Sequence, residues 1–163
     1  MPFDAPHPRR RLPLSAERVH RAIVDASRRV APEHVEGIAA EVHHRAGLHH
    51  PHPVPDLLAE RLGFEVWREP GAPCGSAVLL GGVLVIRASH DARREGLSVL
   101  HEIAHRALRG EHSHGDVWLL TLALAVPPEV AHRPARELRP RAWVPGWAVD
   151  LRLAIRRAVR EGR

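Results

Sequence analysis

The sequence contains one cysteine, no tyrosine and no lysine among its 163 residues. Because Cys74 is alone, no disulfide can form within the chain, which excludes the disulfide-rich class of small secreted domains. Aromatic residues make up only 4% of the chain, so the core must consist mainly of Leu, Val and Ala together with the four Trp. Apolar residues still reach 44%, which is enough for one buried core in a chain of this length.

Long apolar runs are also missing. No stretch approaches the roughly 20 apolar residues of a transmembrane helix. The first fifteen residues are rich in Pro and Arg and lack the apolar segment of a secretory signal. We therefore expect a cytoplasmic protein that makes no membrane contact. Residues 1–13 are predicted to be disordered, and residues 14–163 to form a single domain.

Positive charge is carried by arginine alone. The chain has 24 Arg and a formal net charge of +5, and such a surface favours nucleic acid, acidic lipid or an acidic protein. The sequence lacks zinc-finger spacing, paired RNA-stacking aromatics and a basic-leucine pattern. Abundant Arg, Ala, Pro and Gly are also typical of a GC-rich coding sequence. Direct nucleic-acid binding is an alternative that the charge alone supports.

Apolar spacing predicts helices separated by short β-branched runs. Phe64 begins a strand, and residues 77–80 and 83–86 form two runs joined by Gly81-Gly82, which predicts a tight hairpin. This order indicates an α+β fold with a small antiparallel or mixed sheet and several helices. A Pro- and Arg-rich linker is expected after Pro127. The predicted helices cover residues 15–30, 32–46, 56–62, 91–109, 116–126 and about 147–160.

The segment HEIAH, residues 101–105, carries the strongest chemical signal. His101 and His105 are four apart on a predicted helix, so their imidazoles project from one face and can hold one Zn²⁺. Glu102 points about 100° further round the helix. There it can take a proton from a water on the metal as that water attacks a carbonyl. The pattern is typical of a zinc peptidase.

A catalytic zinc site needs a third protein ligand. The candidates that follow the motif are Glu111, His112, His114 and Asp116. His112 lies only seven residues after His105, so it requires a sharp reversal of the chain. Asp116 begins the next predicted helix and can face back across the ligand helix. We expect Asp116 to be the ligand, with His112 and His114 as rivals.

Between about Pro53 and Pro127 the chain resembles the ImmA/IrrE family of metallo-endopeptidases. PVPDLLAERLGFEVW is similar to the opening helix and first strand of the family. GGVLVIRASHDARREGLSVLHEIAHRAL is similar to its hairpin strand and His-Glu-x-x-His helix, with Ala104 in place of the usual Gly. In DVWLLTLALAVP, Asp116 and Pro127 keep the spacing between the acidic ligand and the closing proline of the family. Asp replaces the usual Glu, and Val-Trp replaces Ala-Asn.

The resemblance implies a zincin-like fold, with the hairpin packed on the His-Glu-x-x-His helix, and a zinc-dependent metallo-endopeptidase. Its metal ligands would be His101, His105 and Asp116, and Glu102 would be the catalytic base. The substrate implied is a protein, commonly a helix-turn-helix transcriptional repressor. The alternative is a catalytically weak or inactive protein of the same fold that regulates or binds DNA through its basic surface. The metal content of the purified protein separates the two.

Overall fold

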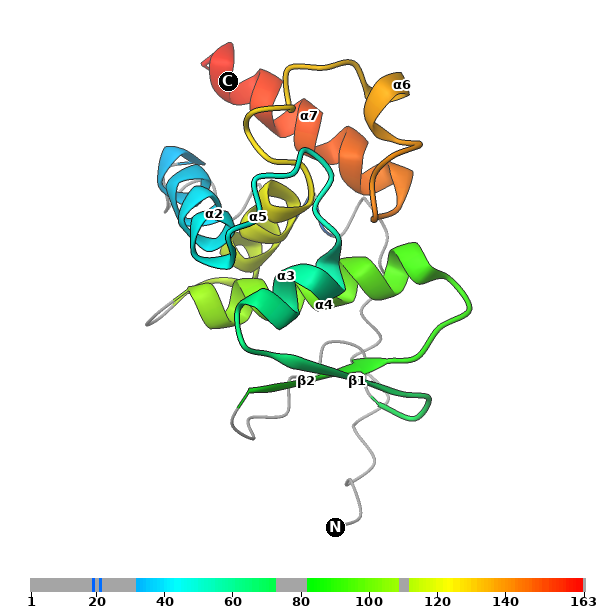
Figure 1. The fold of residues 1–163 in the computed structure, drawn as a ribbon. Helices are drawn as coiled ribbons and strands as arrows, with labels where there is room; N and C mark the ends of the chain where they lie inside the picture. Colours follow the sequence, from blue (N-terminus) through cyan, green and yellow to red (C-terminus); the bar gives the residue numbers. More distant parts are fainter. Residues whose placement is uncertain (1–18, 20, 22–31, 73–81, 109–111, 163) are drawn as a thin grey trace.

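The computed structural model describes residues 19, 21, 32–72, 82–108 and 112–162. These residues form six helices and a two-stranded parallel sheet, which is compatible with the α+β class (Figure 1). The helices are α2 (Pro32–Ala46), α3 (Pro55–Arg61), α4 (Ala92–Ala107), α5 (His114–Ala125), α6 (Ala135–Leu138) and α7 (Gly146–Arg160); the strands are β1 (Glu65–Glu69) and β2 (Val83–Arg87).

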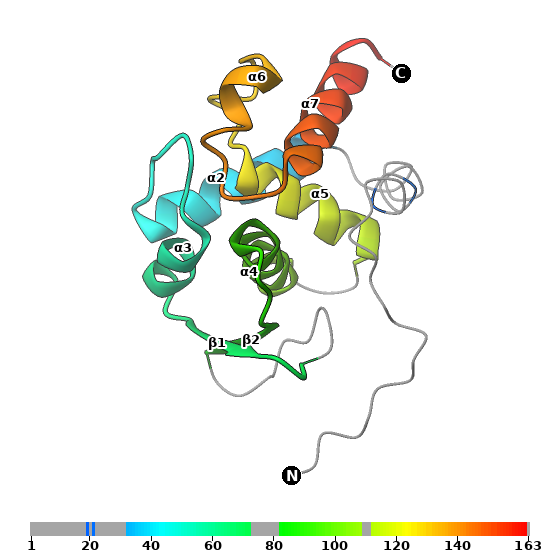
Figure 2. The same ribbon diagram turned by 90° about the vertical axis from the view of Figure 1, so that its right-hand side faces the viewer.

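All six helices lie on one side of the sheet. Figures 1 and 2 show α3 and α4 nearest to the strands, α2 and α5 behind them, and α6 and α7 farthest away. Helix α5 contacts α2, α4 and α7 and so occupies the centre of the helical layers. Its own side chains are mostly apolar on every side, and it is buried from Gly115 to Ala125. A helix that is apolar on all sides is stable only when it is buried, as it is in this central position.

Helix α4 begins where its sequence provides a cap. The side chain of Asp91 accepts hydrogen bonds from the backbone N–H groups of Arg93 at 3.0 Å and Arg94 at 3.3 Å. These bonds satisfy donors that have no partner within the helix. Apolar residues at three- and four-residue spacing then face the core, and the buried ones are Leu97, Val99, Leu100, Ile103 and Ala104. The cap and this stripe fix which face of α4 points inwards.

The two strands pair in parallel, with Glu65 opposite Val83 and Glu69 opposite Arg87. Residues 70–82 connect them, which is long enough for the chain to cross back before it pairs. The second arm of the predicted hairpin is therefore confirmed as β2, although its described partner is β1. The first arm, residues 77–80, lies outside the described residues, as does any antiparallel strand there.

Most of the other predicted elements agree with the structure. Helices α2, α3, α4 and α7 and strand β1 occur within about two residues of their predicted bounds. Helix α5 was predicted to begin at residue 116 and begins two residues earlier, at His114. One prediction was wrong, because residues 135–138 of the predicted linker form α6. The predicted disordered segment 1–13 and helix 15–30 lie outside the described residues, except for Val19 and Arg21. No described helix has the length and apolarity to cross a membrane.

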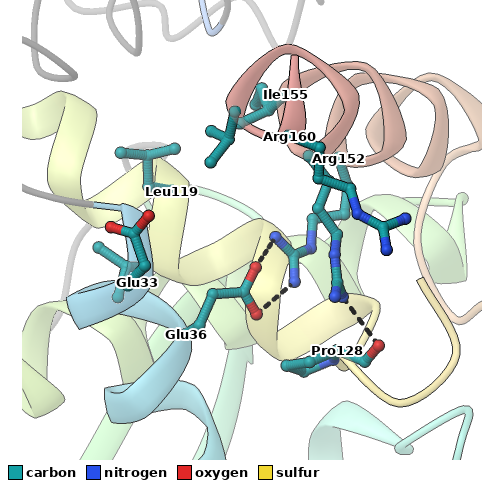
Figure 3. A pocket seen from close by; sticks show the side chains of 10 residues that line it. Glu33, Glu36, Leu119, Pro128, Arg152, Ile155 and Arg160 are labelled. Carbon is teal, nitrogen blue, oxygen red and sulfur yellow. Dashed lines mark hydrogen bonds and ion pairs between the residues drawn. The ribbon is translucent and has the colours of Figure 1, made fainter. Parts of the chain in front are cut away.

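An ion pair joins the first and last described helices. Arg152 of α7 is buried, and its guanidinium donates to both carboxylate oxygens of Glu36 on α2. Its Nε also donates to the carbonyl oxygen of Val126 at 3.2 Å. Figure 3 shows this pair at the wall of a cavity of about 220 Å³ between α2, α5 and α7. Because every nitrogen of Arg152 has an acceptor, burial of its charge is compensated.

Candidate metal centre

Three histidines meet where α4 passes the start of α5. His101 and His105 come from α4, and His114 is the first residue of α5. One ring nitrogen of each lies within 4.8 Å of one from each of the others, which is close enough to hold a metal ion. His101 is buried, His105 is half-buried and His114 is exposed. The cluster therefore has a closed side in the core and an open side towards solvent.

The distance between two of the rings fits a tetrahedral ion. Nε2 of His101 lies 3.3 Å from Nε2 of His114. In a tetrahedral site with Zn–N bonds of about 2.0–2.1 Å, two ligand nitrogens lie roughly 3.3–3.4 Å apart. The two imidazoles therefore already have the separation that zinc requires.

Thr121 fixes the orientation of His101 from behind. The hydroxyl of Thr121 donates to the carbonyl oxygen of Val117 at 2.7 Å, so its oxygen is left to accept. Nδ1 of His101 lies 3.2 Å from that oxygen and donates its N–H to it. This arrangement leaves the lone pair of His101 on Nε2, which faces His114. A ligand histidine that is held through its other nitrogen is a common feature of metal sites.

The surroundings also keep His101 and His105 uncharged. Burial lowers the pKa of His101 to about 3, and the charges of His105 and His114 add to this effect. Burial lowers the pKa of His105 as well, helped by the nearby His114 and His112. At neutral pH both rings therefore offer lone pairs, as a metal ligand must.

Glu102 has a different environment from an ordinary surface carboxylate. It is 1% exposed, and its Oε1 is buried without a hydrogen-bond partner among the described residues. Burial raises the pKa of Glu102 to about 7, and the charge of Arg106 opposes that rise. A carboxyl group with a pKa near 7 can both accept and return a proton under physiological conditions.

Aromatic rings close one side of the cluster. The Trp118 ring lies 4.2 Å from the ring of His101 and stacks on His114 at 6.2 Å between centroids. The ring of His112 lies 5.8 Å from that of His105. Trp118 therefore shields the cluster on the side of α5, and His112 lies close to its edge.

The structure brings His114, rather than Asp116, into the cluster. Asp116 is the third residue of α5, where its Oδ2 accepts from both the backbone N–H and the hydroxyl of Ser113 at 2.8 Å. Ser113 in turn accepts from the backbone N–H of Asp116, which completes a capping box. The Asp116 carboxylate thus caps the N-terminus of α5 through Oδ2, although its Oδ1 is buried without a partner in the described part of the chain. Glu111 lies outside the described residues.

A signal for this arrangement was present in the sequence. Ser113 and Asp116 have the Ser-x-x-acidic spacing of a capping box, which places the helix start at His114 and gives Asp116 a structural task. The prediction placed the start of the helix two residues too late. His114 was named as a rival ligand, and the three-histidine site is the one that the described residues form.

No family model matches the chain, and no curated protein or solved structure matches it either. The resemblance to the ImmA/IrrE family therefore stays a prediction that rests on the sequence motifs. The observation that stands independently of it is the cluster of three histidines, with Glu102 between two of them.

Proposed function

We propose that the protein is a zinc-dependent metallo-endopeptidase in which His101, His105 and His114 hold the metal and Glu102 is the general base. The observation that carries the proposal is the convergence of three histidines at zinc-ligand spacing, with a carboxylate on the same turn of α4. Zinc favours nitrogen ligands, and three protein ligands leave its fourth position open. The exposed side of His114 leaves that position accessible from solvent.

A zinc ion held there would lower the pKa of a bound water and polarise the carbonyl group of a peptide bond. The residues of the chain then have separate tasks. Glu102 takes the proton of the attacking water and delivers it to the leaving amine. Thr121 keeps the imidazole of His101 in the orientation and tautomer that leave Nε2 available. Trp118 limits the access of bulk water from the side of α5.

The substrate class comes from the sequence resemblance. The ImmA/IrrE motifs imply a protein substrate, and a helix-turn-helix transcriptional repressor is the first candidate. A direct test is co-incubation of the zinc-loaded protein with the product of any neighbouring repressor gene. Cleavage fragments that appear with the wild type and are absent with Glu102→Gln would support the proposal. Cleavage by both proteins at equal rates would point to a contaminating peptidase.

One observation favours a second function, a regulatory protein with a structural metal site. Glu102 is almost fully buried, so water must reach it through a rearrangement before it can act as a base. In that case zinc would only stabilise the contact between α4 and α5. Zinc at one per chain, a raised melting temperature and no cleavage of a panel of repressors and unfolded proteins would identify this alternative.

A further inference from the structure

The net positive charge of the chain comes from one end of the sequence. Residues 127–163 contain nine Arg and four acidic residues, whereas residues 1–126 contain fifteen of each. The last 37 residues therefore carry the whole formal net charge of +5. A coding bias towards Arg would raise its number everywhere, but it does not explain why acidic residues balance it in only one part.

The structure gathers this charge in a groove beside α7. The groove has a volume of about 530 Å³ and lies between α7 and the segment that follows α5. His132 and Arg133 line one side, and Arg156, Arg157 and Arg160 of α7 line the other. Arg133, Arg157 and Arg160 are exposed. No residue of the histidine cluster lines this groove, so the two features are separate.

Carboxylates do not neutralise the groove. Asp150 is the single acidic residue that lines it, and Arg139 already pairs with that side chain at 2.6 Å. Within the part of the chain that the structure describes, no ion pair involves Arg133, Arg157 or Arg160. Arg156 is anchored by donating to the carbonyl oxygen of Pro128 at 2.8 Å. Figure 3 shows Arg160 at the neighbouring cavity, on the same helix as Arg152.

The chemistry of the groove favours a phosphate backbone. A guanidinium donates two parallel hydrogen bonds to a phosphate or a carboxylate, and it keeps its charge at any physiological pH. An interface with an acidic protein normally adds large apolar anchors, but the groove contributes only small apolar residues and Leu153. Single-stranded nucleic acid is bound by stacking on aromatic rings, and neither Phe nor Trp lines the groove.

We propose that the groove formed by residues 131–135 and α7 binds the phosphate backbone of double-stranded DNA without reading its sequence. Arg157 and Arg160 are three residues apart, about 4.5 Å along the helix axis, so they can engage neighbouring phosphates. Arg133 approaches from the opposite side of the groove. Such contacts release counterions, so that affinity falls steeply with salt and differs little between sequences.

Fluorescence anisotropy with a labelled duplex of about 20 base pairs tests this proposal between 50 and 200 mM salt. The wild type should bind two unrelated sequences equally. The triple variant R133A/R157A/R160A should bind about tenfold or more weakly at 50 mM salt, and its log–log salt slope should be smaller by about 3. R133K/R157K/R160K, which keeps the charges, should retain most of the slope.

A matched variant removes three exposed arginines elsewhere. R45A/R61A/R94A changes the net charge equally but lies outside the groove, so it should keep the salt slope nearly unchanged. Equal losses in both triple variants, or no binding of the duplex by the wild type, would overturn the proposal. If the groove triple does not fold, R157A/R160A replaces it, with an expected reduction in slope of about 2.

Two competitors decide between ligand classes. A polyglutamate peptide of matched charge and a single strand of matched length should both displace the duplex less effectively than unlabelled duplex does. Stronger competition by either one would contradict the assignment to double-stranded DNA. The measurements are repeated with a chelator to separate this proposal from the zinc site. The salt slopes should be the same with and without it.

Discussion

Nε2 of His101 and Nε2 of His114 lie 3.3 Å apart, although thirteen residues separate them in the sequence. The close contact between α4 and α5 produces this distance, and the cap at Ser113 sets it by starting α5 at His114. A zinc ion at this point would therefore bridge two helices that the fold already holds together.

The ligand set is tested by zinc titration of single alanine variants. His101→Ala and His114→Ala should each weaken zinc binding by at least a hundredfold, because only two protein ligands remain in the first coordination shell. Asp116→Ala should bind zinc within about tenfold of the wild type, although loss of the capping box should cost about 1 kcal/mol in the free energy of unfolding. If Asp116→Ala abolishes binding while His114→Ala retains it, the third ligand is the aspartate.

The role of Thr121 as a positioning residue can be measured separately. Thr121→Val keeps the shape of the side chain but removes the hydroxyl that accepts from Nδ1 of His101. Zinc affinity should fall by about 10- to 100-fold, as is usual when the partner of a ligand histidine is lost. Thr121→Ser restores the hydroxyl and should recover most of the affinity. Equal affinities of the valine and serine variants would show that the hydroxyl does not position the ring.

Sequence reasoning predicted the ligand helix well, because α4 has a cap at Asp91 and a regular apolar stripe. These local signals determine where a helix lies and which face it buries. The parallel pairing of β1 and β2 depends instead on contacts between segments that are not adjacent in the sequence, which composition does not specify. Helix α6 is only four residues long and carries no periodic signal.

The candidate site was predicted in part for the same reason. His101, Glu102 and His105 lie on one helix, so their spacing determines their relative positions. The third ligand comes from another helix, and its identity depends on a helix start that differs by two residues from the prediction. The resemblance implies Asp116 as the third ligand, whereas the capping box uses Oδ2 of that carboxylate and the described cluster contains His114. The pairing of Arg152 with Glu36 spans 116 residues and had no local signal.

The stability of the metal-free protein should depend on pH through His43. This ring is buried, Nε2 donates to the carbonyl oxygen of Leu124 at 3.2 Å, and Nδ1 is buried without a partner among the described residues. Burial lowers the pKa of His43 below 6.5. The unfolded chain therefore binds a proton at a higher pH than the folded chain does. The free energy of unfolding should be unaffected above pH 6.5 and should decrease below it, by up to about 1.4 kcal/mol per pH unit for this group.

Other groups act over the same pH range, so the measurement compares two proteins. His101 has a pKa lowered to about 3 and also destabilises the fold at acidic pH, whereas the pKa of Glu102, raised to about 7, has the opposite effect between pH 7 and 4.5. His43→Gln keeps a donor for Leu124 and removes only one titrating group. Urea unfolding with a chelator should show a shallower loss of stability for the variant between pH 7 and 5. Parallel curves for the two proteins would exclude His43 as a source of the pH dependence.

Two helical glycines provide a matched test of packing around the ligand helix. Gly96 lies on α4, and a Cβ there would overlap the carbonyl oxygen of Trp143 and lie 3.1 Å from Cγ of Pro55. Gly37 lies on α2, where a Cβ would have no neighbour within 4 Å. Alanine is favoured over glycine in a helix by about 1 kcal/mol.

Gly37→Ala should therefore stabilise the protein by up to that amount, since nothing opposes the gain. At Gly96 the obstacle is backbone, which cannot rotate away, so Gly96→Ala should lower the free energy of unfolding by about 1–3 kcal/mol despite the better propensity. Urea unfolding of the two variants measures both values. A stabilised Gly96→Ala protein would mean that the segment around Trp143 does not pack against α4 as described. The same displacement would then separate α3 from α4, because Pro55 begins α3 and borders the same glycine.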